Sequence, residues 1–228
     1  MKRFIDIFGS TIGLIILLPF FPFIALAIKL DSFLFALHNS PSLRATGGSA
    51  AIYFHKIASA ALAMTNSPVL IKLNRVSEGK IIGVYKFRSM EVGAENRKKD
   101  LLSMNERKDG PFFKIKNDPR ITKVGRFLRK TRVDELPQLI NVLKGELSLV
   151  GPRPHEPEEL YAYPREYRIL LAAKTGITGL SQVSGASGLP FLKELELDKY
   201  YLDNQSIWLD IKILLKTLFI FFTDPTGV

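Results

Sequence analysis

Two adjacent carboxylates, Asp134 and Glu135, lie among basic residues in the segment 130–154, KTRVDELPQLINVLKGELSLVGPRP. Pro137 follows them, and a proline is tolerated in the first turn of a helix, where its missing N–H has no intrahelical partner. The pattern therefore predicts a helix that begins here, with Asp134 at or near its N-cap. That end of a helix presents unpaired N–H groups and a partial positive charge, which suit phosphate and an ionised carboxylate.

A carboxylate held in this way could act as a nucleophile on phosphorus and form an acyl phosphate. Magnesium, a hard ion that prefers oxygen ligands, would neutralise a diphosphate beside it. Neighbours on a helix point about 100° apart, so Asp134 and Glu135 would divide attack and metal binding between them rather than face each other. The plainer alternative is that Asp134 only caps the helix and Glu135 is a surface charge.

Arginines flank the acidic pair at Arg129, Arg132 and Arg153. The two prolines of Gly-Pro-Arg-Pro fix the backbone about Arg153, which lowers the entropy cost of holding a guanidinium whose planar fork suits phosphate oxygens. Lys86 and Arg88, in KFRSM, alternate with period two and are expected on one face of a strand. For Arg153, Lys86 and Arg88, solvated surface charge is the alternative to an anion contact.

The composition narrows the class of protein. A chain of 228 residues with 46% hydrophobic residues is long enough for one domain, or for one domain with a small appendage. The formal net charge of +10 attracts polyanions such as nucleic acid, anionic lipid or phosphorylated substrates. The absence of cysteine excludes disulfides and thiolate chemistry, and three histidines without metal-ligand spacing argue against a zinc enzyme.

The N-terminal segment 7–28 has no charged side chain and would form roughly 33 Å of helix, the thickness of a bilayer core. Pro19 and Pro22 lie near its middle and predict a sharp bend. Lys2 and Lys29 flank its two ends, and the positive-inside rule would keep both ends in the cytoplasm. A re-entrant helix–break–helix satisfies both observations, and a kinked transmembrane helix is the alternative.

The rest of the chain predicts a small domain of helices and strands. Residues 68–90 predict a β-hairpin around Ser-Glu-Gly-Lys, because apolar residues alternate along its first strand and return after the turn. Helices are expected at 91–106, as a solvated surface helix, and at 138–144, which Gly145 would end. Residues 117–129 are expected to start as a turn and continue into a basic helix. The expected buried stripe of the basic helix consists of Val124, Phe127 and Leu128.

Two more helices are expected near the C-terminus, at 191–203 and 206–222. The second is nearly all apolar with Trp208 at its start, which favours the membrane interface, and a core helix is the alternative. Residues 31–66 are hard to interpret, although 50–64 is compatible with a helix too short to span a bilayer.

Four motifs occur in a fixed order: KFRSM at 86–90, NDPRITKVGRFLRKTRVDELPQLINVLKGELSLVGPRP at 117–154, TGITGLSQVSG at 175–185 and the ending SIWLDIKILLKT at 206–217. In this order they resemble the bacterial sugar transferases that act as monotopic phosphoglycosyl transferases, the initiating enzymes of exopolysaccharide, O-antigen and glycoprotein-glycan assembly. The resemblance covers the first 32 residues and then Ser67 to about Phe222, and the long DELPQL–GPRP block is its most specific part.

The resemblance implies a fold class and a reaction. It implies an α+β chain: a re-entrant membrane helix-hairpin with a small, mostly helical α/β catalytic domain on the cytoplasmic face, a short β-hairpin and amphipathic interfacial helices. Family members transfer a phospho-sugar from a UDP-sugar to a polyprenyl (undecaprenyl) phosphate, release UMP and use Mg²⁺. The expected partners are the UDP-sugar, the polyprenyl phosphate and lipid of the bacterial inner (cytoplasmic) membrane, without nucleic acid. The oligomeric state stays open, a homodimer being one alternative.

The resemblance also implies roles for residues. The family's Asp-Glu pair matches Asp134, as the nucleophile that forms the phospho-sugar intermediate, and Glu135, which takes part in binding magnesium. The break in the family's membrane helix matches the region from Pro19 to Pro22. The family's basic residues near the phosphates resemble Lys86, Arg88, Arg129 and Arg153.

An insertion interrupts the family pattern, at residues 33–66. The chain is therefore expected to divide into a re-entrant helix at 1–30, an atypical insertion at 31–66 and a catalytic domain at 67–228. Two single positions also depart, because Thr175 replaces the family's usual proline and Ala186 its usual arginine.

These single departures bear on the donor sugar. They also keep a second hypothesis open, a catalytically silent membrane scaffold that recruits glycan enzymes, although the intact DELPQL block favours the enzyme. A third hypothesis, a membrane-anchored nucleic-acid-binding protein, has no base-stacking or groove-reading motif to support it.

Overall fold

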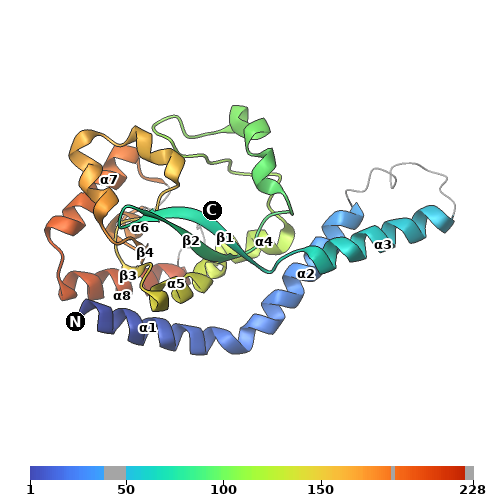
Figure 1. Cartoon of the computed structure of the whole chain (residues 1–228), viewed down its shortest axis with the longest axis horizontal. Coiled ribbons are helices and arrows are strands. Elements are labelled where there is room, and N and C mark those ends of the chain that lie inside the picture. The colour runs from blue at the N-terminus through green and yellow to red at the C-terminus, as the bar shows by residue number, and fades with distance from the viewer. Residues whose placement is uncertain (39–49, 186–187, 224–228) are drawn as a thin grey trace.

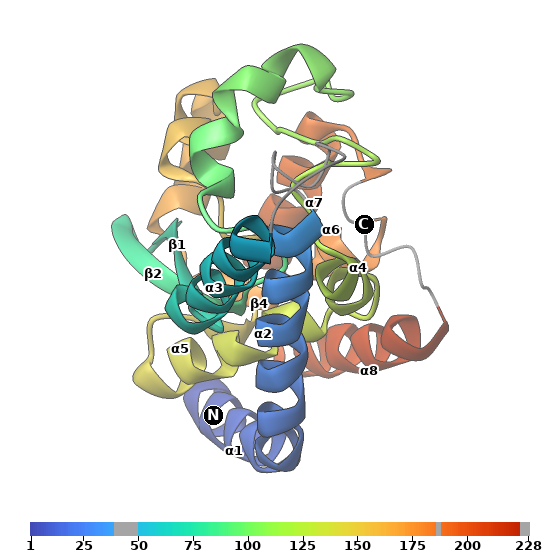
Figure 2. The ribbon, with the colours of Figure 1, turned by 90° about the vertical axis from the view of Figure 1, so that its right-hand side faces the viewer.

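The computed structural model describes residues 1–38, 50–185 and 188–223, and Ala186 lies outside them. Helices surround two small sheets, which confirms the predicted α+β class (Figures 1 and 2). The α-helices are α1 (Lys2–Leu17), α2 (Phe21–His38), α3 (Ala50–Asn66), α4 (Lys123–Lys130), α5 (Leu139–Lys144), α6 (Leu180–Val183), α7 (Phe191–Asp203) and α8 (Ile207–Thr223). The 3-10 helices are η1 (Leu18–Phe20), η3 (Ala94–Arg97), η4 (Lys99–Met104), η5 (Val133–Gln138), η6 (Pro157–Ala162) and η7 (Arg165–Ala172).

The predicted β-hairpin is present as β1 (Leu70–Ser77) and β2 (Lys80–Phe87), which pair antiparallel along their whole length. Glu78 and Gly79 form the turn with φ angles of 51° and 69°. Two left-handed residues give a tight turn whose twist matches that of the strands. A second, parallel pair joins β3 (Ser148–Val150) to β4 (Gly176–Thr178).

Helix α1 and residues 21–32 of α2 form an open V, with the rest of the domain on its inner side (Figure 1). The turn η1 separates the two arms and contains Pro19, while Pro22 lies in the first turn of α2. The continuous helical stretch Lys2–His38 is the one candidate in the described chain that is long and apolar enough, by length and composition, to cross a membrane. It extends beyond residue 30, the boundary that the sequence suggested.

Polar contacts tie both ends of the V to the domain. Near the start of α1, Asp6 is buried and accepts the Leu149 N–H at 2.8 Å. In α2, the buried Asp31 carboxylate accepts the Val124 N–H at 2.9 Å, in the first turn of α4. The apolar V therefore leaves the domain and returns to it.

Two predictions about helices are wrong. Residues 91–106 form two 3-10 turns, η3 and η4, rather than one surface α-helix; only Ala94 is buried in them, so little packing is available to stabilise a longer helix. In α4, Leu128 is buried, but Phe127 is 63% exposed. Val124 and Leu128, four residues apart, pack in one cluster with Leu17, Ile28 and Phe87, and Phe127 does not belong to it.

The C-terminal helices match their predicted positions. Helix α7 buries Phe191, Leu195 and Tyr201 in the core. Helix α8 buries Ile213 but exposes several large apolar side chains, which argues against the core-helix alternative. These are Trp208, Leu215, Leu218 and Phe219.

Candidate active site

The acidic pair lies in η5, not at the N-cap of an α-helix. Arg132, with a φ of 55°, precedes η5, and the α-helix α5 begins only at Leu139. The proline at position 137 explains the difference, because it disfavours the α conformation of the residue before it. The prediction that Gly145 ends the following helix is confirmed by its φ of 83°.

Asp134 is buried, with 7% of its surface exposed. Burial raises the pKa of its carboxyl to about 6, against the opposing charges of Lys86 and Arg129. The group is therefore mostly ionised at neutral pH but poorly solvated. A poorly solvated anion held beside cations has the properties of a nucleophile for an electron-poor phosphorus.

Glu135 is the partner of Lys86 from β2, with 2.6 Å between the lysine Nζ and the glutamate Oε1. Burial alone would raise the pKa of Glu135, but the charge and hydrogen bond of Lys86 outweigh it and hold the pKa below its usual value. The pKa of the Asp134 carboxyl is thus raised and that of the Glu135 carboxyl lowered, although the two residues are neighbours. This separation fits different roles for them.

Arg129, at the end of α4, approaches the same place. Its Nε donates to the Ser89 Oγ at 2.8 Å, just beyond β2. Burial lowers the pKa of Arg129, and the nearby Asp134 charge opposes that effect. Gly125 makes this approach possible, because a Cβ there would meet the Ser89 carbonyl oxygen at 1.8 Å.

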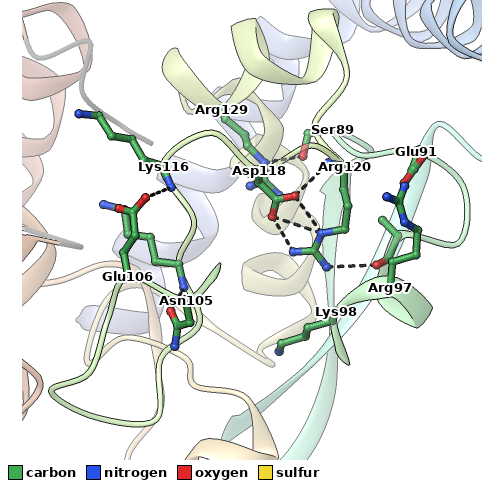
Figure 3. A network of polar contacts seen from close by, with 12 residues as sticks. Ser89, Glu91, Arg97, Lys98, Asn105, Glu106, Lys116, Asp118, Arg120 and Arg129 are labelled. Atoms are coloured by element: carbon green, nitrogen blue, oxygen red, sulfur yellow. Dashed lines mark hydrogen bonds and ion pairs between the residues drawn. The ribbon is translucent and has the colours of Figure 1, made fainter. Parts of the chain in front are cut away.

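A buried ion pair supports the loop that precedes α4 (Figure 3). Arg120 Nη2 donates to Asp118 Oδ2 at 2.6 Å, and its Nη1 donates to the Ala94 carbonyl at 3.1 Å. Asp118 lies between Arg120 and Arg129 in Figure 3. The pair therefore fixes the start of α4, and with it the position of Arg129.

Arg153 is held from α7. Its backbone N–H donates to Asp198 Oδ2 at 3.0 Å, and its Nε lies 3.7 Å from Glu194 Oε1. Burial lowers its pKa, but the charges of Glu194 and Glu135 raise it more, so the net shift is upward. The guanidinium thus interacts with the charge of Glu135 in η5 as well as with the carboxylates of α7.

Close backbone packing fixes the loop that carries Arg153. A Cβ on Gly176 would meet the Gly151 nitrogen at 2.1 Å, so β4 can lie directly against this loop only because that position is glycine. The Gly176 N–H also donates to the Pro152 carbonyl at 2.9 Å.

The sequence analysis did not identify Glu194 and Asp198, each of which is buried with only 1% of its surface exposed. A signal was present. Acidic residues four apart lie on one face of a helix, and in α7 this face also carries Phe191, Leu195 and Tyr201, a pattern unusual for carboxylates.

Arg88 has a different setting from Lys86. It is buried and donates through Nη2 to the Ser32 Oγ in α2, while its Nη1 has no hydrogen-bond partner in the described chain. Burial lowers the pKa of Arg88, and Asp31 opposes that effect. Lys86 thus joins the acidic pair directly, whereas Arg88 connects the hairpin to α2.

Thr175, one of the two single departures, has a visible structural use. Its backbone N–H donates to the Ser77 Oγ at 3.2 Å, and its carbonyl accepts the Ser148 N–H at 2.9 Å. A proline here could not donate the first of these bonds.

The sequence of this chain is similar to known sugar transferases over most of its length. The family model described as bacterial sugar transferase matches residues 42–224. The galactosyl transferase CpsE of Streptococcus agalactiae is 42% identical over 95% of this chain and 41% of its own length. The undecaprenyl-phosphate galactose phosphotransferase of Salmonella typhimurium is 49% identical over 61% of this chain and 30% of its own length.

A third relative has nearly the same extent as this chain. The exopolysaccharide production protein PSS of Rhizobium leguminosarum is 36% identical over 96% of this chain and 93% of its own length. The chain thus spans less than half of CpsE and the Salmonella protein but nearly all of PSS. It belongs to the bacterial sugar transferase family.

Proposed function

We propose that this protein transfers a phospho-sugar from a UDP-sugar to a polyprenyl (undecaprenyl) phosphate and releases UMP, as a first membrane step of surface-glycan assembly. The names of relatives support this reaction class, among them a UDP-glucose:undecaprenyl-phosphate glucose-1-phosphate transferase of Escherichia coli that is 35% identical over the whole chain. The observation that carries the proposal is the buried Asp134 carboxylate, whose charge interacts with Lys86 and Arg129.

In the first displacement, an Asp134 oxygen attacks the β-phosphorus of the UDP-sugar. A bond forms between that oxygen and phosphorus, the bond between the β-phosphorus and the bridging oxygen breaks, and UMP leaves with the electron pair. Arg129 and Arg153 reach the same region and offer cationic donors to the diphosphate oxygens, whose charge grows on the leaving group. The product on the protein is an acyl phosphate, in which the phospho-sugar is joined to the Asp134 carboxylate.

In the second displacement, a phosphate oxygen of polyprenyl phosphate attacks the same phosphorus. The new P–O bond forms as the bond to Asp134 breaks, which regenerates the carboxylate and yields a polyprenyl diphosphate sugar. No net proton transfer to the carboxylate is needed, because the leaving group of this step is the Asp134 anion. The basic groups that oriented the donor can also orient the acceptor phosphate.

Magnesium fits the acidic pair as a shared ion. The described residues contain no group of three acidic or histidine side chains that could hold a metal by themselves. Mg²⁺ commonly uses one or two carboxylates together with substrate phosphates, and Glu135 keeps one oxygen beyond its Lys86 contact. Bound there, the ion would offset the negative charge of the diphosphate.

The same geometry supports a re-entrant path for the N-terminal V. Asp6 and Asp31 fasten its two ends to one domain, so both ends lie on the same side of a membrane that the exposed apolar middle enters. Charge flanking this segment favours the cytoplasmic face of the inner membrane. The exposed apolar side chains of α8 are then available to the membrane interface.

A panel of UDP-sugars tests the function. The purified protein with Mg²⁺ and one UDP-sugar should release UMP in a single stoichiometric burst without acceptor, and continuously once undecaprenyl phosphate is added. Intact mass spectrometry should show one phospho-sugar on the protein without acceptor. Absence of UMP release with every sugar would support the scaffold hypothesis, and release without an adduct would remove the covalent mechanism.

A further inference from the structure

The inserted segment between Ser32 and Ser67 forms an arm of two helices, defined here as residues 33–38 at the end of α2 together with α3. The two helices lie side by side and project beyond the domain (Figures 1 and 2). The Lys29 Nζ donates to the Thr65 carbonyl at 2.8 Å near the base of the arm. The arm therefore leaves the domain and rejoins it at one place.

Arg88 marks this place. Its side chain donates to Ser32 before the arm, and its backbone N–H donates to the Val69 carbonyl at 2.9 Å after it. Because the flanking residues both contact Arg88, the arm is an addition to the domain and not part of its core. The residues of the arm are therefore explained by what its surface contacts and not by packing in the core.

The surface of the arm is strongly apolar. A stripe of exposed side chains runs along α2 at helical spacing and passes from the V onto the arm without interruption: Phe23, Leu26, Leu30 and Leu34. Helix α3 adds Phe54, Ile57 and Leu62, each more than half exposed. A water-soluble surface rarely carries contiguous apolar side chains on this scale.

The charge of the insertion identifies what covers this surface. Between Ser32 and Ser67 the sequence has no Asp or Glu, whereas it contains Arg44 and Lys56. An apolar surface with only basic charges suits the boundary of an anionic bilayer, where cations attract lipid phosphates. Because the apolar stripe of α2 continues onto the arm, the same lipid is expected to cover both.

We infer that the arm is a second lipid-contacting element, which lies in the membrane boundary beside the V. The arm extends the lipid contact to the residues that hold Arg88. This inference goes beyond the proposed reaction, and its test involves no turnover, so a failure of either one leaves the other open.

Single-cysteine labelling of the full chain tests the inference, since the protein has no cysteine to remove. Leu34→Cys and Phe54→Cys, each carrying a polarity-sensitive nitrobenzoxadiazole, are placed in bilayer discs of phosphatidylethanolamine and phosphatidylglycerol. Doxyl-labelled lipid chains should quench both labels as strongly as a label at Phe23→Cys in the V. A label at Tyr161→Cys, 82% exposed in η6 on the side away from α1, is the aqueous control and should respond to iodide instead (Figure 1).

Two results would overturn the inference. If iodide quenches the arm labels as it quenches the Tyr161→Cys label, the arm lies in water. If neither quencher reaches them, protein covers the arm, and energy transfer between labelled copies would identify a second copy as the cover. Because both arm positions are already exposed, loss of folding in one variant leaves the other, and Ile57→Cys supplies a third.

Discussion

Carboxylates from two acidic pairs raise the pKa of Arg153, and the surroundings of the two pairs differ. Asp134 and Glu135 lie on a 3-10 turn, whereas Glu194 and Asp198 lie on the buried face of α7. Burial raises the pKa of both aspartates to about 6. A raised pKa therefore does not by itself identify the nucleophile.

The neighbours make the distinction. Asp134 interacts with the charges of Lys86 and Arg129, while Asp198 accepts the backbone N–H of Arg153 and feels the like charge of Glu194. In the proposed reaction, the η5 pair would act on the diphosphate, and the α7 pair would hold the arginine that binds it. Each prediction below removes one feature of this contrast.

The largest effect is expected from Asp134→Asn. UMP release should fall by at least about 10⁴-fold and the mass adduct should disappear, because the amide cannot form the acyl phosphate. The matched control is Asp203→Asn on the exposed end of α7, which should retain activity. Normal UMP release by Asp134→Asn would mean that another residue is the nucleophile, and the two acidic pairs would then not differ in the proposed way.

Lys86→Met should lower kcat/KM by about 10²-fold, the usual cost of one cationic donor at such a site. It should also shift the acid limb of the pH profile. In the native protein the rate should fall about tenfold per unit below a pH of about 6, since only ionised Asp134 attacks.

Removal of the Lys86 charge takes away the attraction that lowers the Asp134 pKa, so this limb should move to higher pH. Lys80→Met, exposed at the tip of the same hairpin, is the control and should leave the limb in place. A limb that stays at the same pH in Lys86→Met would mean that Asp134 is not the titrating group.

Glu194→Gln should have a smaller effect, a rise in KM for the UDP-sugar of about tenfold with little change in kcat, equivalent to about 1.4 kcal/mol of binding. The reason is that Arg153 loses one orienting charge but keeps the Asp198 contact to its backbone. Glu194→Asp should recover part of the KM. Glu196→Gln, exposed on the same helix, is the control. A fall in kcat without a change in KM would contradict a positioning role.

Asp198→Asn should change stability more than chemistry. Because the folded pKa of about 6 exceeds the ordinary value of 3.8, the native protein loses stability as the pH rises from about 4 to 6. The asparagine variant cannot lose stability in this way. Its free energy of unfolding should exceed that of the native protein by about 2–3 kcal/mol at pH 8, and by almost nothing at pH 4.

Thermal unfolding in detergent at the two pH values measures this difference. An equal difference at both values would mean that the pKa of Asp198 is the same in the folded and unfolded states.

Local pattern predicted those parts of the molecule that local forces decide. Alternation and a Ser-Glu-Gly-Lys turn were enough for the hairpin, and the α7 boundaries at Phe191–Asp203 agree with the prediction. The prediction that Phe127 is buried was wrong, because its exposure depends on how narrowly α4 contacts α2. The prediction of an α-helix at Asp134 was wrong, because the proline was interpreted as a helix start, whereas it delays the regular helix.

The sequence by itself determined the family, the acidic pair and the apolar N-terminal segment, since these depend on residue type and order. Only the tertiary structure decided the electrostatics of the site. Lys86 is 49 positions from Glu135, and Asp198 is 45 positions from Arg153. A carboxylate's pKa depends on its burial and on the charges within a few ångströms, and folding alone brings these groups together.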